Sequence, residues 1–396
     1  MSSIKYIIII TFSLFVISCK KQETALKPQS KLESKKGTFY NMQPFVEKLP
    51  QISAKSIKKL KNTIDTFYND NYVSNDFSGS FLVAQNGQIV YEKYRGMSNF
   101  EEKKAINKET PLHIASLSKV LTATAILLLI DSDKIKLDQK VNTILADFPY
   151  KEITVRMLLN HRTGLRNYSY FTDHKSNWEK GKILKNSDLI PFINQNKIDL
   201  ENKPNTHFSY CNTNFAFLAL IIEKTTSLNY AEAMKMLIFK PLNMKNTFVF
   251  NFDKDQSSVS QSYKGLKTKY AFDYLDAIYG DKNIYSTPRD LLKFDRARNS
   301  SKFLNPDLQK QVYQGYSNER KGTKNYGLGI RMINWQTGQN FYFHNGWWHG
   351  NTSSYITLRK EGVTIIALSN KFTRKTYDVM KLAVLFGDYP FKLKDE

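Results

Sequence analysis

Apolar and polar residues alternate near the start of this chain and again near its end. Between residues 77 and 96 the alternation runs on both sides of Asn86-Gly87. That dipeptide suits a type I′ turn, so the segment predicts a β-hairpin. Similar strand patterns return over 326–333, 340–344 and 353–370. Strands are therefore expected from both ends of the chain.

Helical patterns occupy the middle. Residues 116–130 are almost continuously apolar, and a helix that is apolar on most faces is buried. Residues from 131 to about 280 are helical and rich in loops, and 376–386 predicts a closing helix. The expected fold class is α+β: one antiparallel sheet, built from both chain ends and flanked by helices, with an inserted mainly helical lobe at about 131–280.

The first residues are typical of an export signal. Lys5 precedes a mostly apolar run at 7–17, which is too short to cross a membrane and ends at Ser18-Cys19. We expect residues 1–18 to be a lipoprotein signal peptide, with Cys19 lipidated as the first mature residue. An ordinary secretory signal with a chance cysteine is the alternative. Residues 19–50 are polar and predict a tether, which leaves 51–396 for the folded domain.

Composition narrows the classes of partner. The chain has 396 residues and 41% hydrophobic content, enough for a large core. If Cys19 carries lipid, Cys211 is the only other thiol, and no intramolecular disulfide forms. The net charge of +22 comes mostly from interleaved lysines, without a nucleic-acid-binding motif or zinc-ligand spacing. The excess of positive charge has two explanations. The lysines lie on solvent-exposed faces without a specific role, or they serve adhesion to anionic cell-envelope polymers. No nucleic-acid partner is expected.

A candidate nucleophile stands where the buried helix begins. Ser-x-x-Lys occurs at Ser116 and Lys119, and also at Ser2, Ser18 and Ser56, so the pattern alone carries little weight. Only Ser116 opens a buried helix, where Lys119 falls on the same face in the first turn. The helix dipole and burial favour a neutral lysine there, able to take the serine proton. The structural alternative for Ser116 is a helix N-cap.

A second motif adds a phenol and an amide. In Tyr210-Cys211-Asn212 the phenol can relay the serine proton, and the amide can bind both Lys119 and a substrate carbonyl. A core tyrosine with a capping asparagine is the structural alternative. Tyr316 begins a similar Tyr-x-Asn, but it lies in a polar stretch typical of a surface loop.

A third motif, His344-Asn345-Gly346, is expected to end a strand. Gly346 would let a substrate backbone lie close, and the N–H of Trp347 would be a second oxyanion donor beside the helix N-terminus. A strand-end turn with aromatic packing is the alternative.

The three motifs, in this order, resemble those of the serine β-lactamase and penicillin-binding protein superfamily. Other segments resemble its class C and D,D-peptidase/esterase branch, over roughly residues 75 to 370. These segments are Leu158-Leu159-Asn160-His161-Arg162-Thr163-Gly164-Leu165, Pro241-Leu242-Asn243-Met244, Ser286-Thr287-Pro288-Arg289-Asp290-Leu291 and Tyr326-Gly327-Leu328-Gly329.

The resemblance implies a role for each motif residue. Ser116 would be the acylated nucleophile, and Lys119 and Tyr210 would share proton transfer. Asn212 would orient Lys119 and the substrate, and His344 would line the strand beside the substrate. The turn around His161 is carried over as structure only, with Gly164 suited to a positive φ.

The chain also departs from the family pattern. Asn205 and Asn243 stand where glycines are expected, and asparagine tolerates the left-handed conformation. Cys211 replaces a small residue. The third motif begins with histidine, whereas true β-lactamases generally have lysine. A neutral histidine attracts the β-lactam carboxylate less than a fixed cation does, which favours esterase or peptidase chemistry.

We therefore expect a lipid-anchored serine hydrolase that forms an acyl-enzyme on an ester, amide or D-amino-acid peptide bond. Its substrate would be a small molecule or peptide, with no metal or cofactor. It would be held at the bacterial cell envelope by the lipid on Cys19, facing the periplasm. The alternatives are a true class C-type β-lactamase and a non-catalytic member that binds cell-wall peptides.

Overall fold

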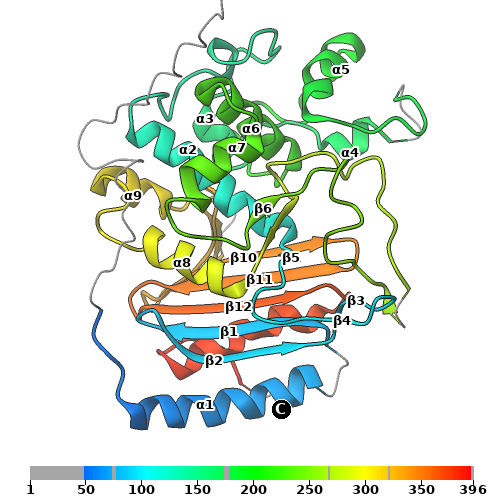
Figure 1. The fold of residues 1–396 in the computed structure, drawn as a ribbon. Coiled ribbons are helices and arrows are strands. Elements are labelled where there is room, and N and C mark those ends of the chain that lie inside the picture. Colours follow the sequence, from blue (N-terminus) through cyan, green and yellow to red (C-terminus); the bar gives the residue numbers. More distant parts are fainter. Residues whose placement is uncertain (1–48, 74–76, 174–177, 266–267, 320–321, 394–396) are drawn as a thin grey trace, which may run out of the picture. The chain divides into compact units, whose positions relative to one another are not determined.

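The computed structural model of the chain describes residues 49–73, 77–173, 178–265, 268–319 and 322–393 (Figure 1). These residues belong to one compact unit, 35–396. The predicted signal peptide at 1–18, Cys19 and nearly all of the tether at 19–50 lie outside the described residues. Within the described ranges, no helix combines the length and apolar character that a membrane crossing requires.

The central sheet of the described chain has seven antiparallel strands from both chain ends, in the order β2-β1-β12-β11-β10-β9-β8 (Figure 1). The N-terminal hairpin joins the C-terminal strands because β1 pairs with β12. This confirms the predicted α+β architecture. The strands are β1 Gly79–Gln85, β2 Gln88–Arg95, β8 Lys324–Tyr326, β9 Arg331–Asn334, β10 Asn340–Trp348, β11 Asn351–Leu358 and β12 Val363–Ser369.

The sequence pattern explains the first hairpin. Asn86 and Gly87 both have positive φ, at 50° and 75°, as a type I′ turn requires. Along β1 successive side chains point to opposite faces. Phe81 and Val83 join the core on one face, while Leu82 and Ala84 join the core on the other. The sheet is therefore buried on both sides.

Helices cover both faces. On one side, α1 and the 3₁₀ segment η7 pack on the face of Phe81 (Figure 1). On the other side, α2, α6 and α8 share the larger core with Leu82. The α-helices are α1 Ala54–Tyr68, α2 Ser118–Asp131, α3 Val155–Leu159, α4 Tyr168–Phe171, α5 Leu189–Asn196, α6 Asn212–Thr226, α7 Tyr230–Met234, α8 Pro288–Arg298 and α9 Pro306–Val312. The 3₁₀ helices are η2 Ala115–Leu117, η3 Val141–Thr143, η4 Asn186–Asp188 and η7 Arg374–Leu385, and the π-helices are η1 Asn69–Val73 and η5 Lys235–Phe239.

Short strands lead into the buried helix. β5 Leu112–His113, β7 Ile284–Ser286 and β6 Phe248–Val249 form a small antiparallel sheet, and β3 Met97–Asn99 pairs with β4 Lys104–Ala105. Immediately after β5 the chain turns through η2 into α2. α2 is buried over nearly its whole length, as its apolar sequence predicts.

Two boundaries differ from the sequence-based prediction. Ser116 lies in η2, one tight turn before α2, rather than at the N-cap of the α-helix. The chain leaves β5 through Ala115, whose φ is 48°, and this sharp turn winds as a 3₁₀ helix before the α-helix begins. The strand predicted at 340–344 continues as β10 to Trp348, because β11 pairs with it along that length.

The two substituted glycine positions keep their turns. Asn205 has φ 64° and Asn243 has φ 53°, so both asparagines adopt the left-handed conformation expected of them. Gly164 has φ 74°, and a Cβ there would lie 1.9 Å from the carbonyl oxygen of Asn202. The turn that carries His161 therefore requires glycine at 164 for conformation and for space.

Candidate active site

Ser116 and Lys119 are in hydrogen-bond contact. Lys119 Nζ lies 3.1 Å from Ser116 Oγ and donates to the carbonyl oxygen of Asp281 at 2.8 Å. Lys119 is fully buried, whereas Ser116 is half-buried. No carboxylate among the described residues forms an ion pair with Lys119. A buried amine that touches a reachable hydroxyl is the geometry for transferring the serine proton.

A buried histidine, His113, stabilises the turn that carries Ser116 through a hydrogen bond to its backbone. His113 Nδ1 accepts a hydrogen bond from the N–H of Ala115 at 3.1 Å, so its proton is on Nε2, which faces Asn283 Oδ1 at 3.0 Å. Burial lowers the pKa of His113 to about 4. The neutral imidazole thus stabilises the positive-φ residue next to the nucleophile.

Tyr210 lies beside the lysine. The Nζ of Lys119 is 5.2 Å from the centre of the Tyr210 ring, and the guanidinium of Arg331 is 4.6 Å from it. No described residue hydrogen-bonds to the Tyr210 hydroxyl. The structure therefore brings Ser116, Lys119 and Tyr210 together, as the sequence motifs predicted, and leaves the phenol available to a substrate.

Asn212 does not make the expected bond to Lys119. The lysine instead donates to the main chain at Asp281, and Asn212 Oδ1 is buried without a hydrogen-bond partner among the described residues. Asn212 is the first residue of α6, directly after Tyr210-Cys211. An unpaired buried acceptor beside Tyr210 is suited to a donor group on a substrate.

Gly346 allows the Ser116 turn to approach β10. A Cβ at this position would lie 2.6 Å from the carbonyl oxygen of Ile114 and 2.9 Å from the backbone nitrogen of Ser116. The close approach that requires glycine is therefore made by the chain itself, rather than by a substrate as the sequence suggested. Trp347 follows as a residue that is 59% exposed, with its ring near that of Phe372. Strand alternation turns that indole away from Ser116, so only its main chain can serve the site.

The His344 side chain is buried beneath the surface of β10. It is fully buried, with Nδ1 2.8 Å from the carbonyl of Asn345 and Nε2 3.3 Å from the hydroxyl of Tyr326. A neutral ring with its proton on Nδ1 satisfies both contacts. Burial, Arg331 and Lys119 hold the pKa of His344 well below its usual range. The prediction of a neutral histidine thus agrees with its surroundings, and a place of His344 beside the substrate stays a prediction.

Arg331 is the residue that sequence reasoning missed. It opens β9, opposite Phe343 of β10, and its guanidinium lies over the rings of Tyr210 and Tyr326. No carboxylate among the described residues pairs with it. Its only sequence signal was a charged residue after Tyr326-Gly327-Leu328-Gly329. The site thus holds a fixed cation, although not in the third motif.

A polar group lies near the end of β10. Asp273, Asp276 and His349 could together offer three metal-ligand atoms. Asp276, however, already accepts bonds from Trp348 Nε1 at 2.6 Å and from its neighbours, including His349 Nε2 at 3.1 Å. The cluster is bonded internally, and the expectation that the enzyme uses no metal stays a prediction.

Tyr316 is far less suited to catalysis. Its hydroxyl contacts Arg156 and the carbonyl of Gln311, and burial raises its pKa. It is half-buried, rather than fully solvated as the polar sequence suggested. Neither contact belongs to the Ser116 site.

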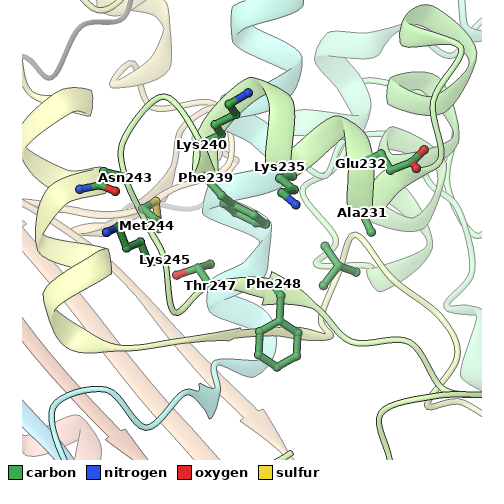
Figure 2. Close-up of a pocket in the computed structure, with 11 residues that line it drawn as sticks. Ala231, Glu232, Lys235, Phe239, Lys240, Asn243, Met244, Lys245, Thr247 and Phe248 are labelled. Atoms are coloured by element: carbon green, nitrogen blue, oxygen red, sulfur yellow. The ribbon is translucent and has the colours of Figure 1, made fainter.

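A separate cavity of about 500 Å³ lies between α7, η5 and β6 (Figure 2). Phe239 forms part of its lining, and Lys235, Lys240 and Lys245 are arranged around it (Figure 2). None of the motif residues lines this cavity.

Comparison with known proteins agrees with this geometry. The model of the Beta-lactamase family matches residues 75–386. Penicillin-binding protein 4* of Bacillus subtilis (strain 168) is 30% identical over 332 residues, which cover 78% of this chain and 73% of that protein. The teichoic acid D-alanine hydrolase of Staphylococcus aureus is 25% identical over 283 residues, covering 70% of this chain and 67% of that protein.

The fold is shared as well. The crystal structure of a penicillin binding protein from Bacillus halodurans superposes with a TM-score of 0.71 at 22% identity, covering 82% of this chain and 99% of that one. The matched residues include all three motifs and the sheet around them. The protein is therefore a serine hydrolase that belongs to the β-lactamase family, within the serine β-lactamase and penicillin-binding protein superfamily.

Proposed function

We propose that this protein is a lipid-anchored hydrolase of the bacterial cell envelope that removes D-alanyl groups from esters or cleaves D-amino-acid peptides through an acyl-enzyme on Ser116. The observation that carries the proposal is the 3.1 Å contact between Ser116 Oγ and the buried Lys119 Nζ, next to Tyr210. Those three groups supply a nucleophile and two proton carriers at one point.

The reaction follows from these positions. Ser116 Oγ attacks the substrate carbonyl carbon while Lys119 Nζ takes its proton, either directly or with the Tyr210 hydroxyl passing one proton on as it receives another. The oxyanion of the tetrahedral intermediate is held by the backbone N–H groups of Ser116 and Trp347. Collapse breaks the bond to the leaving group, which takes the proton, and leaves an ester on Ser116. Water then attacks the carbonyl carbon of this ester and gives a proton to the same base. The bond between that carbon and Ser116 Oγ breaks, the base returns the proton to Oγ, and the acyl group leaves as a carboxylic acid.

Two observations support a D-alanyl substrate with a nearby negative charge. The relative from Staphylococcus aureus is named as a teichoic acid D-alanine hydrolase. The guanidinium of Arg331 lies beside Tyr210 without a carboxylate partner among the described residues. An unpaired arginine at a reaction centre favours a carboxylate or phosphate on the part of the substrate that leaves.

A substrate panel tests the proposal. Purified wild type and Ser116→Ala are assayed on D-alanyl and L-alanyl esters, a D-alanyl-D-alanine peptide and a chromogenic cephalosporin. The proposal predicts the highest kcat/KM on a D-alanyl ester or peptide, and loss of that activity by orders of magnitude in Ser116→Ala. Equal turnover of the D and L esters would contradict the substrate class, and full activity in Ser116→Ala would contradict the mechanism.

Arg331 is tested separately. Arg331→Met is expected to raise KM for a peptide with a free terminal carboxylate, with little effect on the same peptide as its C-terminal amide. Arg359→Met is the matched control, because Arg359 also lies over a tyrosine ring, that of Tyr313 at 3.8 Å. An equal effect of Arg331→Met on both peptides would remove the proposed anion contact.

The same arginine favours the second candidate, a true class C-type β-lactamase. The neutral His344 argued against a β-lactam carboxylate, but Arg331 supplies a fixed cation near that position. Slow or absent cephalosporin turnover remains the prediction. Cephalosporin turnover comparable with the best ester would reverse the preference, and a protein that binds cell-wall peptides without turning over any substrate would support the non-catalytic alternative.

The lipid anchor is proposed from the sequence alone. Cys19→Ser is expected to abolish metabolic labelling with a fatty acid and to release the protein from the membrane fraction. Cys211→Ser is the matched control, because the Cys211 thiol is buried within the fold. Unlipidated, soluble wild-type protein after export would contradict the anchor.

Contact with anionic envelope polymers is also part of the proposal. Lys235, Lys240 and Lys245 are exposed around one cavity (Figure 2), and no ion pair to them occurs among the described residues. Changing all three to glutamate is expected to weaken co-sedimentation with a glycerol-phosphate polymer at low salt. The control is the same change at three exposed lysines of α1, Lys55, Lys58 and Lys59. An equal loss in both triple variants would mean that only net charge matters.

A further inference from the structure

His161 lies directly behind the proposed proton carrier, and no chemistry was assigned to it from the sequence. It follows α3 in a left-handed conformation, with φ 59°, and is fully buried. Its ring centre is 4.5 Å from that of Tyr210 and 4.8 Å from that of Tyr326. A histidine is a costly choice for a packing position, because both ring nitrogens need partners.

His161 holds the chain on both sides of Tyr210. Its carbonyl oxygen accepts the N–H of Ser209 at 2.9 Å, and its Nδ1 accepts the N–H of Cys211 at 3.2 Å. The residues before and after Tyr210 are therefore bonded to the same histidine. Because a backbone fixed at both neighbours leaves little freedom to the residue between them, these bonds set the direction in which the Tyr210 side chain leaves the chain.

A third bond fixes the state of the ring. Asn214 Nδ2 donates to His161 Nδ1 at 3.0 Å, while Asn214 Oδ1 accepts from Thr163 Oγ1 at 2.6 Å. The threonine thus orients the amide so that its donor faces the imidazole. Two donors on Nδ1 require a lone pair there, which puts the single proton on Nε2.

The opposite nitrogen is left without a partner. His161 Nε2 is buried and has no hydrogen-bond partner among the described residues. An unsatisfied buried donor destabilises the folded state, so a residue chosen only for stability would avoid it. Burial, Lys119 and Arg331 also hold the pKa of His161 well below its usual range, which keeps the acceptor on Nδ1.

We propose that His161 is a positioning residue that acts on the reaction through Tyr210: its Nδ1 and carbonyl oxygen clamp the backbone around Tyr210, and its ring supports the phenol beside Lys119. The inference rests on the proposed function in one respect, that Tyr210 carries a proton in the acyl transfer. It adds that the orientation of this phenol is imposed by one neutral imidazole.

Two variants of His161 distinguish the role of its Nδ1 acceptor from the role of its aromatic ring. His161→Phe keeps an aromatic ring and removes the Nδ1 acceptor, whereas His161→Asn places an amide oxygen close to the position of Nδ1. His161→Phe is expected to lower kcat about 10- to 100-fold with little change in KM, since a misplaced group impairs the transition state more than binding. His161→Asn is expected to recover most of that loss. If His161→Phe does not fold, His161→Asn decides the matter by itself: a kcat within about threefold of wild type supports the acceptor role, and a loss of about tenfold or more overturns it.

Each His161 variant is then combined with Tyr210→Phe and, as a matched control, with Tyr316→Phe. If His161 acts through Tyr210, its loss falls to less than about twofold in the Tyr210→Phe background and persists in full in the Tyr316→Phe background. Losses that multiply in both backgrounds would overturn the inference while leaving the proposed function intact. Full activity of Tyr210→Phe alone would instead overturn the role of Tyr210 and, with it, the positioning role of His161.

Discussion

Gly346→Ala offers the sharpest structural test of how Ser116 is held. The new Cβ would lie 2.6 Å from the carbonyl oxygen of Ile114, 2.9 Å from the nitrogen of Ser116 and 2.4 Å from Ser353 Oγ. Two of these atoms are backbone, so η2 must retreat by roughly 1 Å to restore ordinary van der Waals separation. Ser353 Oγ donates to the Ile114 carbonyl at 2.6 Å, and this bond would also be strained.

Because Ser116 is part of η2, a shift of that size moves the nucleophile itself. Ser116 Oγ is 3.1 Å from Lys119 Nζ, and a 1 Å misplacement of a reacting group can cost about 10²-fold in rate. Overpacking of a core contact typically costs about 1–3 kcal/mol of stability. We therefore expect Gly346→Ala to fold, to melt at a lower temperature, and to acylate about 10²-fold more slowly.

The assay is the rate of acylation by a fluorophosphonate, followed by intact mass, alongside thermal denaturation. Gly265→Ala is the matched control, because its Cβ would meet nothing within 4 Å. Acylation of Gly346→Ala within about threefold of wild type, in a folded protein, would refute the claim that this glycine sets the position of Ser116.

Three further predictions follow from the same structure. Tyr210→Phe is expected to lower kcat/KM by about 10²–10⁴-fold, as loss of a proton-transfer group does, while Tyr316→Phe is near neutral; the reverse pattern would identify the wrong tyrosine. Asn205→Ala and Asn243→Ala are each expected to lower stability by about 1–2 kcal/mol in urea titrations, because alanine resists the left-handed conformation, whereas glycine at either position is tolerated. The pKa values of His113, His161 and His344 are lowered in the folded state, mainly by burial, so the unfolded chain binds more protons below about pH 6.5. Stability should therefore fall with decreasing pH, by about tenfold in the folding equilibrium per histidine and pH unit; urea midpoints that stay level from pH 7.5 to 5.5 would contradict this.

Local sequence patterns predicted the elements well, because each depends on near neighbours. The Asn86-Gly87 turn and the alternation around it determine the first hairpin, and the apolar run after Ser116 determines a buried helix. The contact of Ser116 with Lys119 could be predicted for the same reason, because the two residues lie one helical turn apart.

Long-range neighbours could not be predicted in this way. Arg331 reaches Tyr210 because β9 pairs with β10, whose His344 ring centre lies 6.4 Å from that of Tyr210, a relation that no local pattern encodes. The second partner of Lys119 is a main-chain carbonyl at Asp281, and any residue type offers such a group. His344 was expected beside the substrate because His344-Asn345-Gly346 resembles a family motif. The surroundings of its ring include Tyr326, which belongs to another strand and could not be inferred from the motif.

The central claim is that Ser116 carries the acyl group, and trapping that intermediate tests it most directly. Wild-type protein is incubated with a D-alanyl ester, quenched in acid during turnover and digested, and the acylated peptide is identified by mass spectrometry, with a fluorophosphonate adduct mapped in parallel. The account predicts a single modified residue, Ser116, with both adducts absent from Ser116→Ala. An adduct on another serine, or turnover that persists in Ser116→Ala, would contradict it.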